Sequence, residues 1–195
     1  MSLLRRDDSL LLVIDTQEGF YGEQRLDIDR PAFARFVERV AWVAGVARAL
    51  DVPVVVTEED PGLNGPTSPR VMARLPAGAA VFPKPVFAAG DDPAILAAIE
   101  ATGRRTVVIA GLETDVCVSH SALSLTARGY AVAAVSDALF SPSGAHEHGL
   151  ARLRAGGVQL LSAKELSYDW VRTVAGARAL IAENPELAAP PGFSL

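Results

Sequence analysis

The amino-acid sequence predicts an α/β protein of the three-layer, doubly wound type, with a mainly parallel sheet and helices on both faces. Two observations predict this class. Short apolar runs rich in Val, Ile and Leu alternate along the chain with longer helical stretches, which is the order of βαβ units. The runs are apolar almost throughout, as in strands that are buried on both faces. Right-handed crossovers between such strands place helices on both sides of the sheet.

Five apolar runs are predicted to be strands. Each is short and rich in β-branched or other apolar residues. Two further segments, 58–68 and 78–90, contain several Gly and Pro residues and are predicted to be irregular. The predicted strands are residues 10–14, 52–57, 106–110, 131–135 and 158–160.

Five helices are predicted from their start and stop signals. Pro31 stands at the start of the first, where its missing N–H leaves no helical bond unmade. Asp92 is near the start of the second, where a negative charge suits the helix dipole. Gly129 follows the third as a left-handed cap, and Gly156 follows the fourth. The predicted helices are residues 31–50, 91–101, 115–128, 144–155 and 169–182.

Length and composition indicate one ordinary globular domain. The chain has 195 residues, half of them hydrophobic and 21% charged. We assign the domain to residues 1–183 and expect the proline-containing tail, 184–195, to be extended. The net charge of −5 and the lack of a basic run argue against a nucleic-acid partner. The first apolar run is too short for a signal peptide or a membrane span, so we expect a cytoplasmic protein outside the membrane.

Three reactive side chains fall near the predicted carboxyl ends of strands. Asp15 follows the first strand, Lys84 lies in the irregular segment before the second helix, and Cys117 begins the helix after the third strand. In open parallel sheets, ligands bind outside the carboxyl ends of the strands. The topology is therefore expected to gather these side chains at one edge of the sheet.

Cys117 is the single cysteine of the chain, so it forms no internal disulfide. At a helix N-terminus, free N–H groups and the helix dipole favour the thiolate, which is the nucleophilic form. The same N–H groups can bind an oxyanion as a carbonyl becomes tetrahedral. A small buried core residue explains an isolated Cys equally well, so position alone leaves both interpretations open.

Asp15 and Lys84 also have ordinary alternatives. A carboxylate beside a thiol can take its proton and return it to a leaving group, but an Asp after a strand commonly caps a turn. An ammonium beside both groups would stabilise the thiolate and the carboxylate, although a lone Lys in a loop is usually solvated. Pro85 biases the backbone of Lys84 toward extended conformations.

Taken together, these segments resemble the isochorismatase-like cysteine hydrolases. The matching motifs are Leu-Leu-Val-Ile-Asp15-Thr-Gln17, Lys84-Pro-Val-Phe87 and Gly111-Leu-Glu-Thr-Asp-Val-Cys117-Val. A fourth match is Gly129-Tyr-Ala-Val-Ala-Ala-Val-Ser-Asp137-Ala-Leu. The resemblance extends over almost the whole chain, and the Gly-x-x-Thr-Asp-x-Cys motif is its most specific part.

The resemblance implies that Cys117 is the nucleophile, Asp15 the general base and acid, and Lys84 their electrostatic partner. It implies a cis peptide bond between Leu112 and Glu113, which would turn the Glu113 N–H toward the Cys117 N–H to form an oxyanion hole. The implied fold has about six strands and usually forms a homo-oligomer, whether a dimer, a tetramer or a larger assembly. The implied reaction is hydrolysis of a small amide-type substrate through a thioester.

No metal and no other cofactor is expected. The nicotinamidase branch of this family carries an Asp and two His as metal ligands after the second strand. The matching stretch here, residues 57–67, contains carboxylates but no His, and carboxylates with carbonyls form a poor zinc site. The stretch is more similar to a metal-free branch, whose substrates are mostly unknown.

Three further residues are candidates for contact with a small-molecule substrate. Gln17 lies two residues after Asp15, and Phe20 and Phe87 lie near the motifs. Aromatic rings there could supply the apolar wall that most ligand sites have. Core packing is the alternative for at least one of them.

Three other interpretations make different use of the chain. His120, three residues after Cys117, could serve as its base, but it would point away from the sheet edge and leave Asp15 without a role. The chain could instead be an inert or ligand-binding member of the fold with an unreactive Cys. Dinucleotide binding is excluded, because Asp15-Thr-Gln-Glu-Gly stands where a Gly-x-Gly-x-x-Gly motif would follow the first strand.

Overall fold

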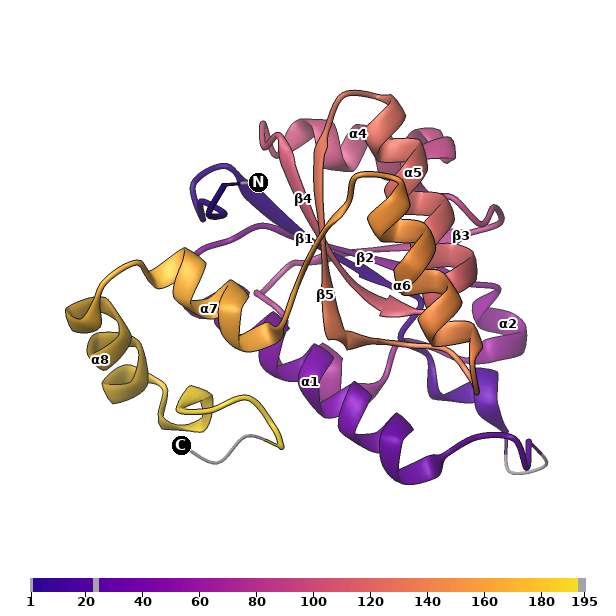
Figure 1. Ribbon diagram of the computed structural model, residues 1–195, viewed down its shortest axis with the longest axis horizontal. Coiled ribbons are helices and arrows are strands. Elements are labelled where there is room, and N and C mark those ends of the chain that lie inside the picture. The colour runs from indigo at the N-terminus through magenta and orange to yellow at the C-terminus, as the bar shows by residue number, and fades with distance from the viewer. Residues whose placement is uncertain (1, 23–24, 193–195) are drawn as a thin grey trace.

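The chain folds into one sheet of six parallel strands between two layers of helices (Figure 1). The computed structural model describes residues 2–22 and 25–192. The strand order is β3-β2-β1-β4-β5-β6. The chain therefore moves outward from β1 in one direction, crosses back, and moves outward in the other, with the switch point between β1 and β4. The predicted fold class is confirmed.

Strands and helices account for most of the described chain. The strands are β1 (Ser9–Ile14), β2 (Val54–Glu59), β3 (Ala80–Lys84), β4 (Thr106–Leu112), β5 (Ala131–Phe140) and β6 (Gln159–Leu161). The α-helices are α1 (Arg30–Ala49), α2 (Pro61–Asn64), α3 (Pro69–Met72), α4 (Pro93–Ala101), α5 (Ser119–Ala127), α6 (Ala145–Ala155), α7 (Ala163–Val171) and α8 (Val174–Glu183). None of the helices in the described ranges is long and apolar enough to cross a membrane.

β1 lies near the centre of the sheet and is buried on both faces. Leu11 and Val13 point into the apolar layer that contains α1 and α7. Leu10, Leu12 and Ile14 point into the layer that contains α4, α5 and α6. Successive side chains of a strand point to opposite faces, which explains why this run is apolar throughout.

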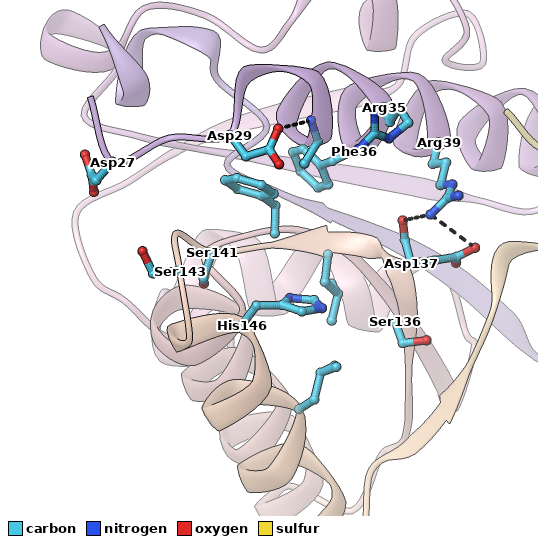
Figure 2. A pocket seen from close by; sticks show the side chains of 14 residues that line it. Asp27, Asp29, Arg35, Phe36, Arg39, Ser136, Asp137, Ser141, Ser143 and His146 are labelled. Carbon is cyan, nitrogen blue, oxygen red and sulfur yellow. Dashed lines mark hydrogen bonds and ion pairs between the residues drawn. The ribbon is translucent and has the colours of Figure 1, made fainter. Parts of the chain in front are cut away.

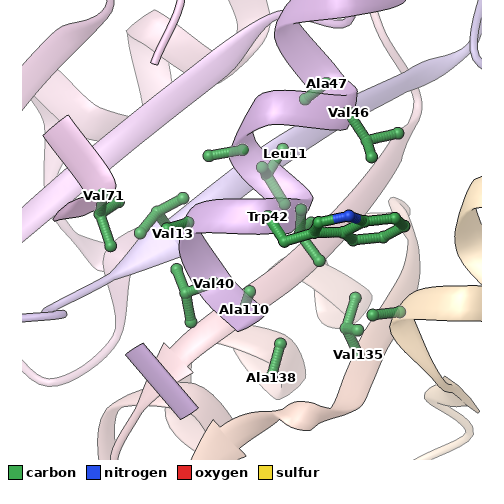
Figure 3. Packing of buried hydrophobic residues seen from close by; sticks show 14 of the residues in the cluster. Leu11, Val13, Val40, Trp42, Val46, Ala47, Val71, Ala110, Val135 and Ala138 are labelled. Carbon is green, nitrogen blue, oxygen red and sulfur yellow. The ribbon is translucent and has the colours of Figure 1, made fainter. Parts of the chain in front are cut away.

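Helix α1 covers one face of the sheet with large apolar side chains. Val40, Trp42 and Val46 of this helix belong to the same buried cluster as Leu11 and Val13 of β1 (Figure 3). Burial of one such side chain contributes roughly 1.5–3 kcal/mol. Because α1 connects β1 to β2, this packing helps to hold the two strands side by side.

The edge strand β3 was not predicted. It occupies part of the segment 78–90, which the sequence predicted to be irregular, and Pro83 lies within it. A proline cannot donate a hydrogen bond to a neighbouring strand, so it is tolerated at the edge of a sheet and not at its centre. Since β3 pairs with β2 alone, it is an edge strand, where a proline is tolerated.

Two predicted helices also differ from the structure. The helix expected at 169–182 is two helices, α7 and α8. Arg172 lies between them with a φ of 69°, a conformation that interrupts an α-helix. Helix α7 begins earlier, at a capping box in which Ser162 and Glu165 each bind the other's backbone N–H. The helix expected at 115–128 begins with a π-helical turn, Thr114–Val118, and continues as α5.

The described part of the tail is packed, so the expectation of an extended tail is wrong for residues 184–192. A 3-10 turn covers Pro185–Leu187, and Leu187 belongs to the buried cluster that contains α1. The Nε of Arg39 donates a hydrogen bond to the carbonyl of Pro191 at 3.0 Å. Residues 193–195 lie outside the described ranges.

We expect Leu187→Ala to lower the free energy of unfolding by about 2–4 kcal/mol, as truncation of a buried leucine does. Leu187 is 3% exposed. A leucine in an extended, solvated tail would contribute little to the free energy of unfolding. Leu26 is 94% exposed, so Leu26→Ala is a matched control with an expected change within about 0.5 kcal/mol. Denaturant titration measures both variants, and equal midpoints would contradict a packed tail.

Candidate active site

Asp15, Lys84 and Cys117 come together at the carboxyl edge of the sheet. Asp15 follows β1, Lys84 is the last residue of β3, and Cys117 lies in the turn after β4. The Nζ atom of Lys84 lies 3.0 Å from Oδ2 of Asp15 and 3.5 Å from Sγ of Cys117. The exposed fractions of Asp15, Lys84 and Cys117 are 0%, 1% and 3%. The three predicted catalytic residues therefore form one buried cluster.

The carboxylate of Asp15 is oriented by the neighbouring strand β2. Thr57 donates its hydroxyl hydrogen to Oδ1 of Asp15 at 2.6 Å, and its carbonyl accepts the N–H of Asp15 at 3.0 Å. Asp15 has a φ of 47°, a left-handed conformation that Asp tolerates better than most residues. With Oδ1 held by Thr57, Oδ2 is the atom that meets Lys84.

Lys84 is held in place by its own segment as well as by Asp15. Its Nζ donates a hydrogen bond to the carbonyl of Val86 at 2.7 Å. The ammonium thus contacts a carboxylate, a carbonyl and a sulfur atom, which compensates for its removal from water. Loss of one partner from such a buried pair leaves an uncompensated charge and is strongly destabilising.

Cys117 lies in the π-helical turn that follows β4. The carbonyl of Glu113 accepts the N–H groups of Val116 at 3.2 Å and of Val118 at 3.0 Å, which closes this turn. The peptide bond between Leu112 and Glu113 is cis. π-helical turns occur frequently at functional sites. The assignment of an oxyanion hole to the N–H groups of Glu113 and Cys117 stays a prediction.

Burial raises the pKa of the Cys117 thiol and the pKa of the Asp15 carboxyl. For Cys117, the charge of Asp15 adds to the effect of burial, and Lys84 opposes it. For Asp15, Lys84 and Thr57 oppose the effect of burial without cancelling it. Lys84 therefore favours the thiolate, as the sequence suggested, but burial and the charge of Asp15 outweigh it and leave the pKa of the thiol raised. Burial thus favours the protonated thiol, and it makes Asp15 a better proton acceptor than an exposed carboxylate.

A fourth polar side chain, not among the residues predicted from the sequence, contacts Cys117. Glu59 is the last residue of β2, and its Oε2 lies 3.3 Å from Sγ of Cys117. It is the register partner of Lys84 in the pairing of β2 with β3. The alternation of a strand could have identified it, because Thr57 and Glu59 lie on the same face of β2 and Thr57 binds Asp15.

A cavity of about 790 Å³ lies beside this cluster and is lined by residues 59–61, 83–87 and Asp92. We call this cavity the mouth. Glu59 and Lys84 line the mouth, and each contacts the sulfur of Cys117. Phe87 also lines it and is 57% exposed. Phe87 is therefore placed where the sequence predicted a substrate contact.

Gln17 and Phe20 do not line the mouth. The amide of Gln17 donates hydrogen bonds to the carbonyls of Glu59 at 3.0 Å and Gly65 at 2.6 Å, and it accepts the N–H of Glu59 at 2.8 Å. Gln17 is fully buried and holds the end of β2 in place, which replaces the predicted substrate contact. Phe20 packs against the apolar layer that contains α1, which is the alternative described above.

The side chain of Glu113 is fixed by a buried tyrosine. The hydroxyl of Tyr21 donates a hydrogen bond to Oε1 of Glu113 at 2.8 Å. The Tyr21 ring packs edge-on against Phe33 and Phe140, with centroid distances of 5.1 Å and 5.6 Å. Burial and the neighbouring Glu113 raise the pKa of Tyr21, so the hydroxyl keeps the hydrogen that it donates. Tyr21 thereby anchors the residue that precedes the π-helical turn.

The histidines near the site are engaged elsewhere. Nδ1 of His120 lies 2.7 Å from the carbonyl of Val116, one turn earlier. Nδ1 of His146 lies 2.9 Å from the hydroxyl of Thr114. These contacts give both rings structural partners away from the sulfur of Cys117.

Asp15, Glu59 and Cys117 could each offer one ligand atom to a metal ion, since these atoms lie within 4.8 Å of one another. Lys84 already contacts two of the three groups, at 3.0 Å and 3.5 Å. A metal ion would have to displace this ammonium, so the donor set does not fit a resident cation. We assign no metal or cofactor to these residues.

A second cavity, of about 740 Å³, lies between α1, the end of β5 and the start of α6. Figure 2 shows Arg39 directed toward Asp137 on one side of this cavity and His146 on the other. Asp15, Lys84 and Cys117 do not line it. It is therefore separate from the cluster around Cys117.

The parallel sheet, with a polar cluster at its carboxyl edge, places the chain among the α/β enzymes, and the comparisons with known proteins define the class as hydrolase. Residues 9–165 match the family model described as the isochorismatase domain. The chain belongs to the isochorismatase family.

Three relatives illustrate this membership. The mouse isochorismatase domain-containing protein 2A is 33% identical over 171 residues, which are 85% of this chain and 76% of that protein. The YcaC structure from Escherichia coli, an octameric hydrolase of unknown specificity, is 26% identical with a TM-score of 0.81, over 96% of this chain and 94% of that one. The YcaC structure from Pseudomonas aeruginosa, with hexane-2,5-diol and covalent acrylamide, is 28% identical with a TM-score of 0.80, over 95% and 93%.

Proposed function

We propose that this isochorismatase-family hydrolase acts on a small amide-type substrate through a thioester of Cys117, with Asp15 and Lys84 completing a catalytic triad. One observation carries the proposal. The Nζ of Lys84 lies 3.0 Å from Asp15 and 3.5 Å from the sulfur of Cys117 in a buried cluster. Nucleophilic catalysis requires a nucleophile and a base in contact with each other, together with a group that orients them.

In the proposed cycle, Asp15 takes the proton of Cys117 as the sulfur attacks the substrate carbonyl. The N–H groups of Glu113 and Cys117 bind the developing oxyanion. Asp15 then gives the proton to the leaving ammonia or amine, the C–N bond breaks, and a thioester forms. Water, deprotonated by Asp15, hydrolyses the thioester and restores the thiol.

The raised pKa values of Asp15 and Cys117 fit a mechanism in which Asp15 takes the thiol proton while the sulfur attacks the substrate. Hydrolysis requires Asp15 to be ionised and Cys117 to hold its proton until the substrate arrives. Because the pKa of Asp15 is raised, the rate should rise at a higher pH than an ordinary carboxylate would give. Because the pKa of Cys117 is raised as well, the rate should stay level through neutral pH.

Assembly and location are secondary parts of the proposal. The octameric state of E. coli YcaC supports a homo-oligomer for this chain, which light scattering of the purified protein would test. A cytoplasmic location, a small-molecule substrate and the absence of a nucleic-acid partner stay predictions from the sequence.

The test is ammonia release from a panel of small primary amides, combined with intact-mass spectrometry after an acid quench. We expect turnover with at least one amide and an acyl adduct on Cys117. Cys117→Ala should lose roughly 10⁴-fold or more in kcat, as removal of a nucleophile does in serine proteases. Turnover that persists in the folded Cys117→Ala protein would overturn the proposal.

A further inference from the structure

We propose that Glu59 selects substrates that carry a positive charge, so that the preferred substrate is a small cationic amide. This inference rests on the proposed function and adds the class of substrate. It is carried by the position of Glu59, whose Oε2 lies 3.3 Å from the sulfur of Cys117 while its side chain also lines the mouth.

The carboxylate of Glu59 is not neutralised by a cation of the protein. Among the described residues, no Lys, Arg or His forms an ion pair with it. The nearest ammonium, on Lys84, is paired with Asp15 at 3.0 Å. A carboxylate that faces a cavity without a cationic partner attracts a cationic ligand and repels an anionic one.

The other two acidic residues of the mouth cap helices. The side chain of Asp92 accepts the N–H groups of Ala94 and Ile95 and caps α4. The side chain of Asp60 accepts the N–H of Leu63 and caps α2. Their charges nevertheless add to that of Glu59, so the mouth as a whole is negative.

The remaining lining of the mouth is apolar. Pro61, Pro83, Pro85, Val86 and Phe87 supply it. Apolar walls with one charged group near the nucleophile suit a short aliphatic or aromatic amide that ends in an ammonium or amidinium group. An anionic amide of the same length would meet like charge and no free cation.

Substitution of Glu59 should leave the local fold intact. The contacts that hold the end of β2 use the backbone N–H and carbonyl of Glu59, bound by Gln17 and by the amide of Asn64. The side chain takes no part in them. Glu59→Gln therefore removes the charge and keeps the backbone contacts.

The first test uses the single cysteine as a reporter of charge. Three methanethiosulfonate reagents of similar length carry a 2-aminoethyl, a 2-hydroxyethyl or a 2-sulfonatoethyl group. In each reaction the Cys117 thiolate forms a disulfide with the reagent, and methanesulfinate leaves. All three reagents attack the same thiolate, so the ratio of cationic to anionic rates cancels any change in thiolate fraction. Each rate is divided by the rate with a free thiol.

We expect this normalised ratio to exceed about ten in the wild-type protein and to fall by about tenfold in Glu59→Gln, as loss of one nearby charge predicts. Glu100→Gln removes a charge from the exposed face of α4 and should leave the ratio unchanged. An equal ratio in wild type and Glu59→Gln overturns the inference. Equal slowing of all three reagents in Glu59→Gln also overturns it. Glu59 would then affect the reactivity of the thiol and would not select the charge of the substrate.

The second test compares β-alaninamide, butyramide and succinamate, which are cationic, neutral and anionic primary amides of similar size. We expect hydrolysis in that order of kcat/KM, and we expect Glu59→Gln to reduce the advantage of β-alaninamide about tenfold. If the reagent ratio falls as expected while Cys117→Ala has no effect on any turnover, the proposed function fails and the charge selection by Glu59 stands. If Cys117 is required but the three amides react alike, only the inference about Glu59 fails.

Discussion

Replacement of Asp15 by Asn is expected to slow hydrolysis and to accelerate alkylation of Cys117. The loss in kcat should be about 10²–10⁴-fold, the range for removal of a general acid and base. Alkylation should become faster, because the charge of Asp15 raises the thiol pKa and the substitution removes that charge. The charge of Lys84, which lowers the thiol pKa, remains. With Asp15 neutral, the effect of Lys84 at 3.5 Å from the sulfur is opposed by burial and Glu59 but no longer by the charge of Asp15. Each unit by which the thiol pKa falls multiplies the thiolate fraction about tenfold at neutral pH.

The measurement is the rate of iodoacetamide labelling at pH 7, followed by intact mass, beside an amide hydrolysis assay. Glu100→Gln makes the same change in net charge at a distant exposed position and should alter neither rate. Labelling in denaturant gives the rate of the unfolded chain, so a variant that fails to fold is recognised by equal rates with and without denaturant. Slower labelling in a folded Asp15→Asn protein would contradict the electrostatic account and show that Asp15 activates the thiol in both reactions.

Gly111→Ala is expected to destabilise the protein by about 4 kcal/mol or more, which lies at the upper end for single substitutions. Gly111 has a φ of 132°, and a Cβ atom there would lie 2.0 Å from the carbonyl oxygen of Ile14. Ile14 and Gly111 are register partners in the centre of the sheet, so neither backbone can move aside. The substitution would push β1 away from β4 and separate Asp15 from Cys117.

Denaturant titration, or soluble yield where the variant does not fold, measures this effect. Gly103→Ala is the matched control, because Gly103 also has a positive φ, of 67°, but has no atom within 4 Å of the added Cβ. It should lose only about 1–2 kcal/mol, the steric cost of the left-handed conformation. Similar losses in the two variants would show that backbone conformation, and not contact with Ile14, makes Gly111 necessary.

The parts of the fold that the sequence predicts are those with a strong local pattern. The run 10–14 is apolar throughout and became β1, and Gly129 ends a helix with a φ of 89°. β3 escaped prediction because Pro83 disfavours a strand and only its edge position allows one. Leu187 was placed in an extended tail, because nothing local to it reveals the cluster around α1 that buries it.

In the site too, residues with a local sequence pattern were predicted, and features that depend on the tertiary structure were not. Asp15, Lys84 and Cys117 were found because each follows a strand or lies in a motif, and parallel strands end at one edge. Glu59 was considered only as a metal ligand, and its contact with Cys117 depends on the register that pairs it with Lys84. The net rise of the Cys117 pKa was not predicted, because the depth of burial that outweighs Lys84 is not visible in a sequence.

The isolation of Cys117 makes it an internal probe of conformational stability. It is the single thiol of the chain, it is 3% exposed, and it is enclosed by segments that lie far apart in the sequence. A thiol reagent too bulky for the mouth would modify it only when those segments separate. Where reclosing is faster than modification, the native rate divided by the rate in the unfolded chain equals the equilibrium constant for opening. Thiol labelling would thus give, without an added label, the free energy that keeps the two halves of the sheet together at the site.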